Sequence, residues 1–162
     1  MSTDFRDIYG SDGLYGLELT CQAWHELYAW VSGDYLSKTG ESCLGYRTKA
    51  YFIPLGFGLK YLKLFSIDTN QSIGLYAGAG VLGTYLHTKD DSPFVVTTLH
   101  AWGVGGVVKG GILLTKDSLF LDLFTNYSFQ SFRGKGSSEP LVYAHNTTIN
   151  GWSFGSGLGV KF

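Results

Sequence analysis

The chain has few charged residues, and their two signs nearly cancel. Asp, Glu, Lys and Arg make up 15% of the 162 residues, where roughly a quarter is usual. Twelve basic and thirteen acidic residues leave a formal net charge of −1. Proteins that bind nucleic acid through its phosphates carry a basic surface. We therefore expect no nucleic-acid partner.

Long hydrophobic runs are missing as well. No stretch approaches the roughly 20 consecutive apolar residues of a transmembrane helix, so we expect no such helix. The opening residues 1–4 (MSTD) contain no basic segment followed by an apolar one, as a secretory signal would. We expect a mature or trimmed form that carries an added initiator Met.

Cysteine is scarce too. Cys21 and Cys43 are too few for a disulfide scaffold, and we expect both to be free thiols. Neither the cysteines nor the four histidines have the spacing of a metal site. We expect no metal and no cofactor.

Glycine and aromatic residues are abundant, and the stretch 151–162 shows how they are arranged. Its residues alternate with a period of two, so that large apolar side chains share one face and glycines the other. A soluble barrel has no reason to line its wet face with glycine, which costs backbone entropy. A narrow membrane barrel needs an apolar outer face and small residues in its crowded interior. The apolar face holds Trp152, Phe154, Leu158, Val160 and Phe162, and the other face holds Ser153, Gly155, Gly157, Gly159 and Lys161.

The same alternation recurs in six earlier stretches, which begin near residues 14, 27, 50, 73, 101 and 119. Short turns are expected at 25–26, 66–71 and 116–117, and long polar loops at 37–47, 87–94 and 133–150. Short turns on one side and long loops on the other are typical of outer-membrane barrels. The sequence therefore predicts an all-β fold, an antiparallel up-and-down transmembrane β-barrel of about eight strands, forming one domain over residues 1–162.

Only seven of these strands are clear, and an even-stranded barrel needs one more before Leu14. Either Phe5–Tyr9 supplies a short first strand, or part of the natural N-terminus is missing; we favour closure by the short strand. Pro54 falls within the third strand, where its missing N–H predicts a bulge.

Six charges fall on inward positions of these strands, three acidic and three basic. An unpaired buried charge is strongly unfavourable, so a narrow interior should pair them. We expect a salt-bridge network that plugs the lumen, with a polar path for small solutes as the alternative. The residues are Glu18, Asp34, Lys60, Lys109, Asp122 and Lys161.

Aromatic residues on outward positions predict two girdles at the membrane interfaces. Tyr51 and Tyr61 share a face ten positions apart, which projects to roughly 25 Å on a tilted strand, the height of the apolar band of such barrels. His87, His100 and His145 fall near one rim, where histidine is common. A metal or pH role there is the weaker alternative. The expected girdle residues are Tyr51, Tyr61, Tyr85, Trp102, Tyr127 and Trp152.

An enzyme is not expected. The segment 145–148 (HNTT) is only loosely similar to the His/Ser site of outer-membrane lipid A deacylases, because no serine follows the histidine. A Ser-His-acid set cannot be assembled elsewhere.

Taken together, the chain resembles small bacterial outer-membrane β-barrels of the OmpA, OmpX and OmpW type. It is most similar to uncharacterised chlamydial-type barrels, through the segments FRDIYG, CQAWHELYAWVS, IPLGFGLKYL, LYAGAG and GWSFGSGLGVKF. The resemblance places Gly157, Val160 and Phe162 on the C-terminal signal that the barrel assembly machinery reads.

This resemblance implies a protein of the Gram-negative outer membrane, surrounded by lipid and inserted by that machinery. It implies a structural or surface-interaction role, with unknown protein partners at the loops. The alternative is a narrow, porin-like channel for small or apolar solutes, as suggested for OmpW-like proteins.

Overall fold

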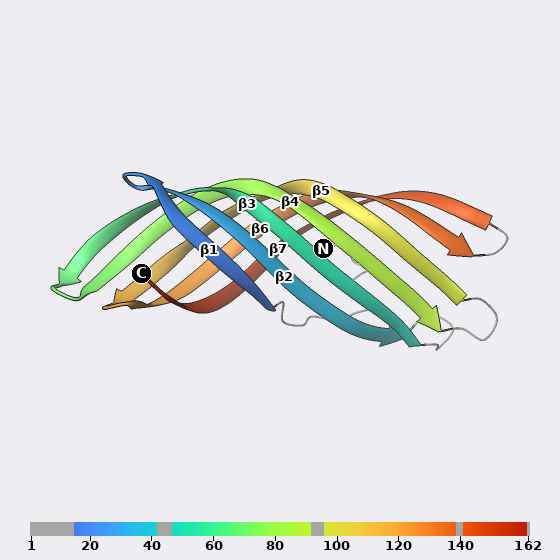
Figure 1. The fold of residues 1–162 in the computed structure, drawn as a ribbon, viewed down its shortest axis with the longest axis horizontal. Coiled ribbons are helices and arrows are strands. Elements are labelled where there is room, and N and C mark those ends of the chain that lie inside the picture. Colours follow the sequence, from blue (N-terminus) through green and yellow to red (C-terminus); the bar gives the residue numbers. More distant parts are fainter. Residues whose placement is uncertain (1–14, 42–46, 92–95, 139–140, 162) are drawn as a thin grey trace.

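The computed structural model describes residues 15–41, 47–91, 96–138 and 141–161. Seven antiparallel strands form one sheet in chain order, each hydrogen-bonded to the next (Figure 1). This confirms the predicted all-β, up-and-down arrangement. No helix in these ranges is long and apolar enough to cross a membrane. The strands are β1 (Tyr15–Trp24), β2 (Leu27–Glu41), β3 (Arg47–Asp68), β4 (Gln71–Asp91), β5 (Val96–Lys116), β6 (Leu119–Ser138) and β7 (Leu141–Val160).

Three two-residue turns join the strands at one end of the sheet, at 25–26, 69–70 and 117–118. His25 and Asp117 adopt positive φ angles of 44° and 54°. Few residues other than glycine enter this left-handed region, but tight hairpins require it to match the twist of their strands. The short turns predicted at these three places are confirmed.

The connections at the other end are shorter than predicted, because the strands continue into the polar segments. The prediction of a long loop over 133–150 was wrong, since β6 continues to Ser138 and β7 begins at Leu141. Backbone pairing runs without interruption from Arg133↔Asn146 to Ser138↔Leu141. Period-two alternation marks a strand that has one apolar face, so a polar hairpin gives no such signal.

The bulge predicted at Pro54 was also wrong. The register between β2 and β3 is the same on both sides of it, from Gly33↔Leu55 to Leu36↔Phe52. On its other side Pro54 stays in register with Thr84 of β4. The ladder toward β2 lacks the pairs at 53–54, where proline has no N–H to donate. The flanking pairs are enough to hold the register.

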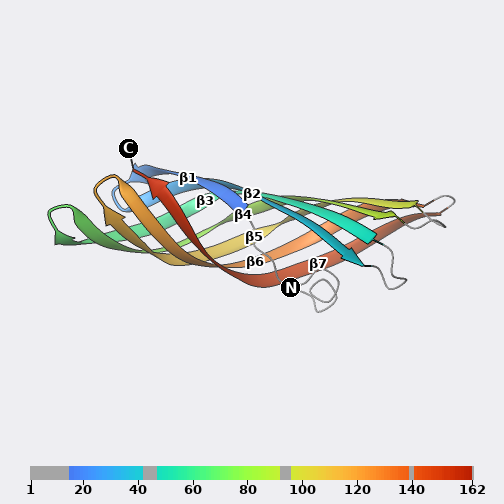
Figure 2. The same cartoon turned by 90° about the horizontal axis from the view of Figure 1, so that it is seen from below.

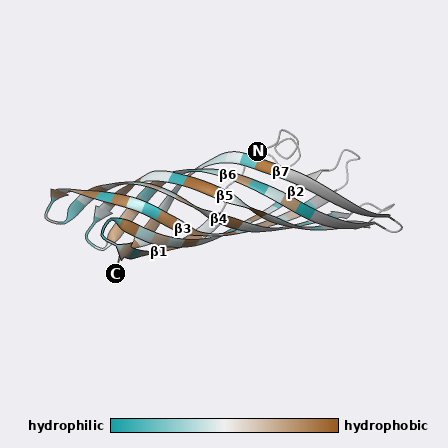
Figure 3. Ribbon diagram, turned by 90° about the horizontal axis from the view of Figure 1, so that it is seen from above, coloured by the Kyte–Doolittle hydropathy of each residue, from teal (hydrophilic) through white to brown (hydrophobic). Residues whose placement is uncertain are grey.

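The two faces of the sheet differ as the alternation predicted. On β5, the outward residues Trp102 and Val104 are each 66% exposed, whereas the inward residues Ala101 and Val107 are 3% and 6% exposed. Figure 3 shows hydrophobic and hydrophilic positions following one another along single strands. The other buried apolar residues also lie inward: Trp30, Ala50, Leu62, Tyr76, Leu82 and Phe132.

Glycines on the inner face provide space for these large side chains. A Cβ added to Gly80 would overlap the ring of Trp30, and one added to Gly155 would overlap the ring of Phe124. By contrast, a Cβ at Gly83 on the outer face meets nothing within 4 Å. The glycine-rich face predicted from the sequence is therefore a packing requirement of the interior.

The sheet curves until strands far apart in its order meet across the inner face. In a flat sheet β1 and β5 would be roughly 19 Å apart, at about 4.8 Å per strand. Yet Glu18 of β1 forms an ion pair with Lys109 of β5. The ring centroids of Phe52 on β3 and Phe132 on β6 are 6.1 Å apart. Figure 2 shows the single curved sheet from a second side.

The curved sheet is open in the described residues, because β1 and β7 do not pair with each other. The predicted closure into a barrel is not found there. Both are odd-numbered strands of an up-and-down sheet and run in the same direction, so antiparallel closure needs one more strand between them. The segment Phe5–Tyr9, expected to supply it, lies outside the described residues.

Candidate functional site: a charge cluster inside the sheet

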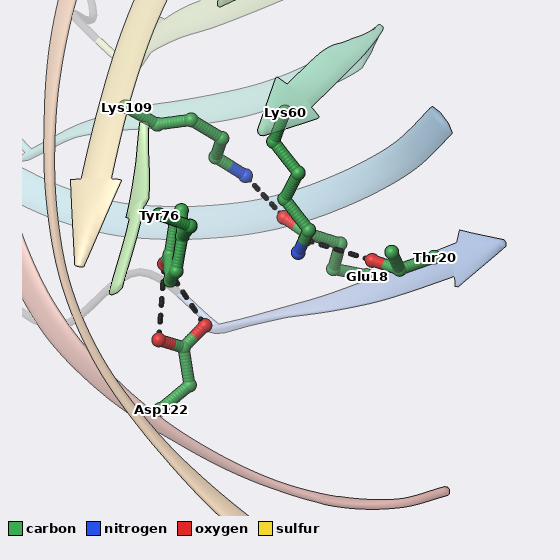
Figure 4. A network of polar contacts seen from close by, with 6 residues as sticks. All are labelled: Glu18, Thr20, Lys60, Tyr76, Lys109 and Asp122. Carbon is green, nitrogen blue, oxygen red and sulfur yellow. Dashed lines mark hydrogen bonds and ion pairs between the residues drawn. The ribbon is translucent and has the colours of Figure 1, made fainter. Parts of the chain in front are cut away.

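A cluster of charged and aromatic side chains lies inside the curved sheet (Figure 4). Its members occupy inward positions of five strands, which the period-two geometry of each strand fixes. Lys60, Tyr76 and Lys109 are only 7%, 7% and 8% exposed. The cluster consists of Glu18 on β1, Lys60 on β3, Tyr76 on β4, Lys109 on β5 and Asp122 on β6.

Glu18 is the centre of the cluster. Its Oε1 accepts a hydrogen bond from Lys60 Nζ at 2.8 Å, and its Oε2 accepts one from Lys109 Nζ. Thr20 Oγ1 also donates to Oε1, at 3.2 Å. Removing an ammonium group from water costs several kcal/mol unless a counter-charge and hydrogen bonds compensate. One carboxylate compensates here for two buried lysines.

Aromatic rings complete the surroundings of both lysines. Lys109 Nζ lies 4.1 Å from the ring centroid of Trp30, and Lys60 Nζ lies 5.0 Å from that of Tyr76. Both distances are within the range of cation–π attraction. The Tyr76 hydroxyl is shared between the two carboxylate oxygens of Asp122, 3.0 Å from each. A continuous set of polar contacts thus crosses the interior from β1 to β6.

The structure brings together four of the six predicted lumen charges, namely Glu18, Lys60, Lys109 and Asp122. Asp34 also faces inward, and its carboxylate occupies the space that a Cβ at Gly16 would need. Lys161 is exposed, and its backbone N–H donates to Ser118 O at 2.7 Å. Within the described residues, no hydrogen bond or ion pair joins Lys161 to the cluster, which therefore has fewer bases than the sequence suggested.

Lys38 is an interior residue that the sequence analysis missed. It is 8% exposed on β2, whereas the sequence placed it in a loop at 37–47. Lys38 is in phase with Trp30 and Asp34 on the inner face, so the alternation of β2 could have been followed further. The polar composition around it concealed this continuation.

The predicted girdle residues form close pairs on the outer face. The ring centroids of Tyr85 and Trp102 are 4.9 Å apart, and those of Tyr127 and Trp152 are 5.0 Å apart. Tyr51 stacks on His87 at 5.9 Å. Tyr61 lies near the short-turn end, where its hydroxyl donates to Glu26 Oε2.

The structure describes two of the three residues of the predicted C-terminal signal. Val160 faces outward and is 52% exposed, and Gly157 faces inward opposite Asp122. Phe162 lies outside the described residues.

The contacts of the cluster join lysine, tyrosine, threonine and carboxylate side chains. The hydrogen bonds and ion pairs found among the described residues join no Ser, Cys or His side chain to it. In the same part of the chain, no group of three or more His, Cys, Asp and Glu side chains is placed to hold a metal ion.

Comparison with known proteins adds no assignment: no family model, curated protein or solved structure shows significant similarity to this chain.

Proposed function

We propose that the protein is an outer-membrane β-barrel with a structural or surface-interaction role, whose lumen is closed by side chains and paired charges. The distribution of polarity is the observation that carries this proposal. Large apolar side chains are exposed over the outer face, whereas Lys60 and Lys109 are buried inside. Such an extended apolar surface is unfavourable in water. Lipid is the solvent that suits it.

The length of the strands supports a role at the cell surface. A tilted strand needs about 9–11 residues to cross a bilayer, and β5 and β6 contain 21 and 20 residues. The two-residue turns at 25–26, 69–70 and 117–118 allow little extension, so the excess projects beyond the lipid at the opposite end of the sheet. These projecting polar hairpins are the surface on which protein partners would bind.

Closure of the barrel is part of the proposal. One strand that is antiparallel to both β1 and β7 would satisfy their unpaired backbone groups, which lipid cannot do. We place this eighth strand on the N-terminal side of β1, with Phe5–Tyr9 as the segment available in this chain. Gly157, Val160 and Phe162 would then be read by the assembly machinery of the bacterial outer membrane.

A narrow channel is the second candidate function. Thr84 Oγ1, Asn126 Oδ1 and Gln130 Oε1 are buried and have no hydrogen-bond partner among the described residues. Such groups favour an interior that admits water or small polar solutes. Trp30 and Phe132, 3% and 2% exposed, instead fill the same interior. In a barrel of about eight strands the interior is just wide enough for its side chains, so we place the closed lumen first.

Folding from denaturant into detergent or lipid vesicles tests the membrane assignment. We expect a β-type circular dichroism spectrum with amphiphile and aggregation without it. A stable, soluble β-sheet monomer in buffer alone would contradict the proposal and favour a lipocalin-like barrel. Planar-bilayer recording separates the two functions: we expect no steady conductance, and a reproducible one would favour the channel.

A further inference from the structure

A pair of histidines occupies one cross-strand position on the outer face, near the end of β4 and the start of β5. His87 and His100 are directly opposite in the register of these two strands. Their ring centroids lie 4.5 Å apart, and their Nδ1 atoms lie 3.2 Å apart. The charge cluster inside the sheet uses neither residue, so the pair needs an explanation of its own.

A third donor atom lies beside this pair. The Tyr85 hydroxyl is 2.7 Å from His100 Nδ1, the same nitrogen that lies close to His87 Nδ1. A ring nitrogen carries either one proton or one lone pair. His100 Nδ1 therefore cannot satisfy both neighbours with two full hydrogen bonds. His100 Nδ1 thus has a second imidazole nitrogen and a phenol oxygen as close neighbours.

The spacing of the two nitrogens matches that of ligands on one metal ion. Zn–N bonds are about 2.0–2.1 Å long, so two ligand nitrogens in a tetrahedral site lie roughly 3.3 Å apart. The observed distance between the Nδ1 atoms is 3.2 Å. Directly opposite residues of an antiparallel pair have close Cβ atoms, so the backbone itself sets this spacing.

We infer that His87 and His100 bind one divalent transition-metal ion of the Zn²⁺ class through their Nδ1 atoms, with the Tyr85 hydroxyl oxygen as the third ligand. Water would complete the coordination. Imidazole suits Zn²⁺, Cu²⁺ and Ni²⁺, whereas Mg²⁺ and Ca²⁺ prefer oxygen ligands. The inference does not rest on the proposed membrane location, because the pair is defined by the pairing of β4 with β5.

Neighbouring rings hold two of the three donors in place. Tyr51 stacks on His87 with 5.9 Å between ring centroids and 26° between ring planes. Trp102 packs against Tyr85 at 4.9 Å. Side chains that packing already orders lose less conformational freedom on binding, which favours affinity. The pair is accessible from outside the sheet, since His100 is exposed and His87 is partly exposed.

Isothermal titration calorimetry with Zn²⁺ alone tests the inference, on untagged protein folded in detergent. We expect about one ion per chain. His87→Asn and His100→Asn should each lower the affinity for Zn²⁺ by at least roughly 10- to 100-fold. Loss of an outer-shell partner of a metal ligand already causes a decrease of this size, and loss of the ligand itself should cost at least as much. The matched control is the double variant His25→Asn/His145→Asn, which removes the other two histidines and should bind Zn²⁺ like the parent chain.

Three outcomes are decisive once circular dichroism has shown that every variant retains the parent spectrum. Zn²⁺ affinity equal in the parent chain and in His87→Asn/His100→Asn would overturn the site. Loss of binding in the control variant would overturn it as well. In Tyr85→Phe we expect a smaller loss than in either histidine variant, and an unchanged affinity would remove Tyr85 as a ligand.

Discussion

The outer and inner faces of β5 differ by a single step along the chain. Val108 is 54% exposed on the outer face, and its neighbour Lys109 is 8% exposed on the inner face. In a protein surrounded by water, the valine would be expected to be buried and the lysine to be exposed. The reversed arrangement is stable here because Glu18 neutralises Lys109 from across the sheet. Charges paired on the inside and apolar side chains exposed on the outside are the arrangement that the proposed lipid-facing barrel requires.

The largest expected effect on stability comes from a charge placed on the outer face. Val108→Arg lies near the middle of β5, so in lipid vesicles it should lower the free energy of unfolding by up to about 4 kcal/mol. Urea titration monitored by tryptophan fluorescence measures the loss. The matched control is Asn70→Arg, in the turn between β3 and β4, where the same side chain remains in water and should have little effect. Equal losses at both positions would mean that the outer face does not contact lipid.

The next effect comes from the inner face. Glu18→Gln leaves Lys60 and Lys109 buried without their counter-charge, and it should cost about 3 kcal/mol in the same unfolding titration. This is the lower end of the range for breaking a buried ion pair, because the Glu18 side chain is 27% exposed.

A triple variant separates charge from packing. Glu18→Gln combined with Lys60→Met and Lys109→Met removes all three charges while keeping side chains of similar size. Most of the stability lost in Glu18→Gln should return, because apolar residues replace buried ion pairs at little cost. If the triple variant is less stable than Glu18→Gln, the ion pairs are not what governs this interior.

A smaller effect distinguishes glycines on the two faces. Gly80→Ala pushes a methyl group into the Trp30 ring and the backbone at Phe57, and overpacking of this kind costs about 1–3 kcal/mol. Gly83→Ala enters open space on the outer face and should change stability by no more than about 0.5 kcal/mol. Thermal unfolding of both variants in one detergent measures the difference. Comparable destabilisation would show that the glycines do not act through interior packing.

Period-two alternation was sufficient to predict the parts of the strands that have an apolar face, the short turns and the two faces. It placed Trp102 and Lys109 on opposite sides of β5 because consecutive side chains of a strand always point to opposite faces. It also located the turn at 25–26, between two alternating stretches. These are local properties, and each needs only a few neighbouring residues.

The contacts across the interior could not be read from the sequence in the same way. Glu18 contacts Lys60 and Lys109, whereas no contact among the described residues joins Lys161 to them. Both facts depend on the curvature of the sheet and on the register of every strand in between. Alternation carries no information about either. The polar hairpin of β6 and β7 was missed for a different reason, since backbone pairing holds it together without an apolar face.

Quenching by lipids with brominated acyl chains tests most directly the claim that the outer face contacts lipid. Two single-tryptophan variants are compared in vesicles, one keeping Trp152 on the outer face and one keeping Trp30 inside, with the other tryptophans changed to Phe. Trp152 is 66% exposed and Trp30 is 3% exposed. Because brominated chains quench only on close contact, Trp152 fluorescence should fall strongly and Trp30 fluorescence should remain nearly unchanged. Equal quenching of the two, or quenching of Trp30 alone, would contradict the account.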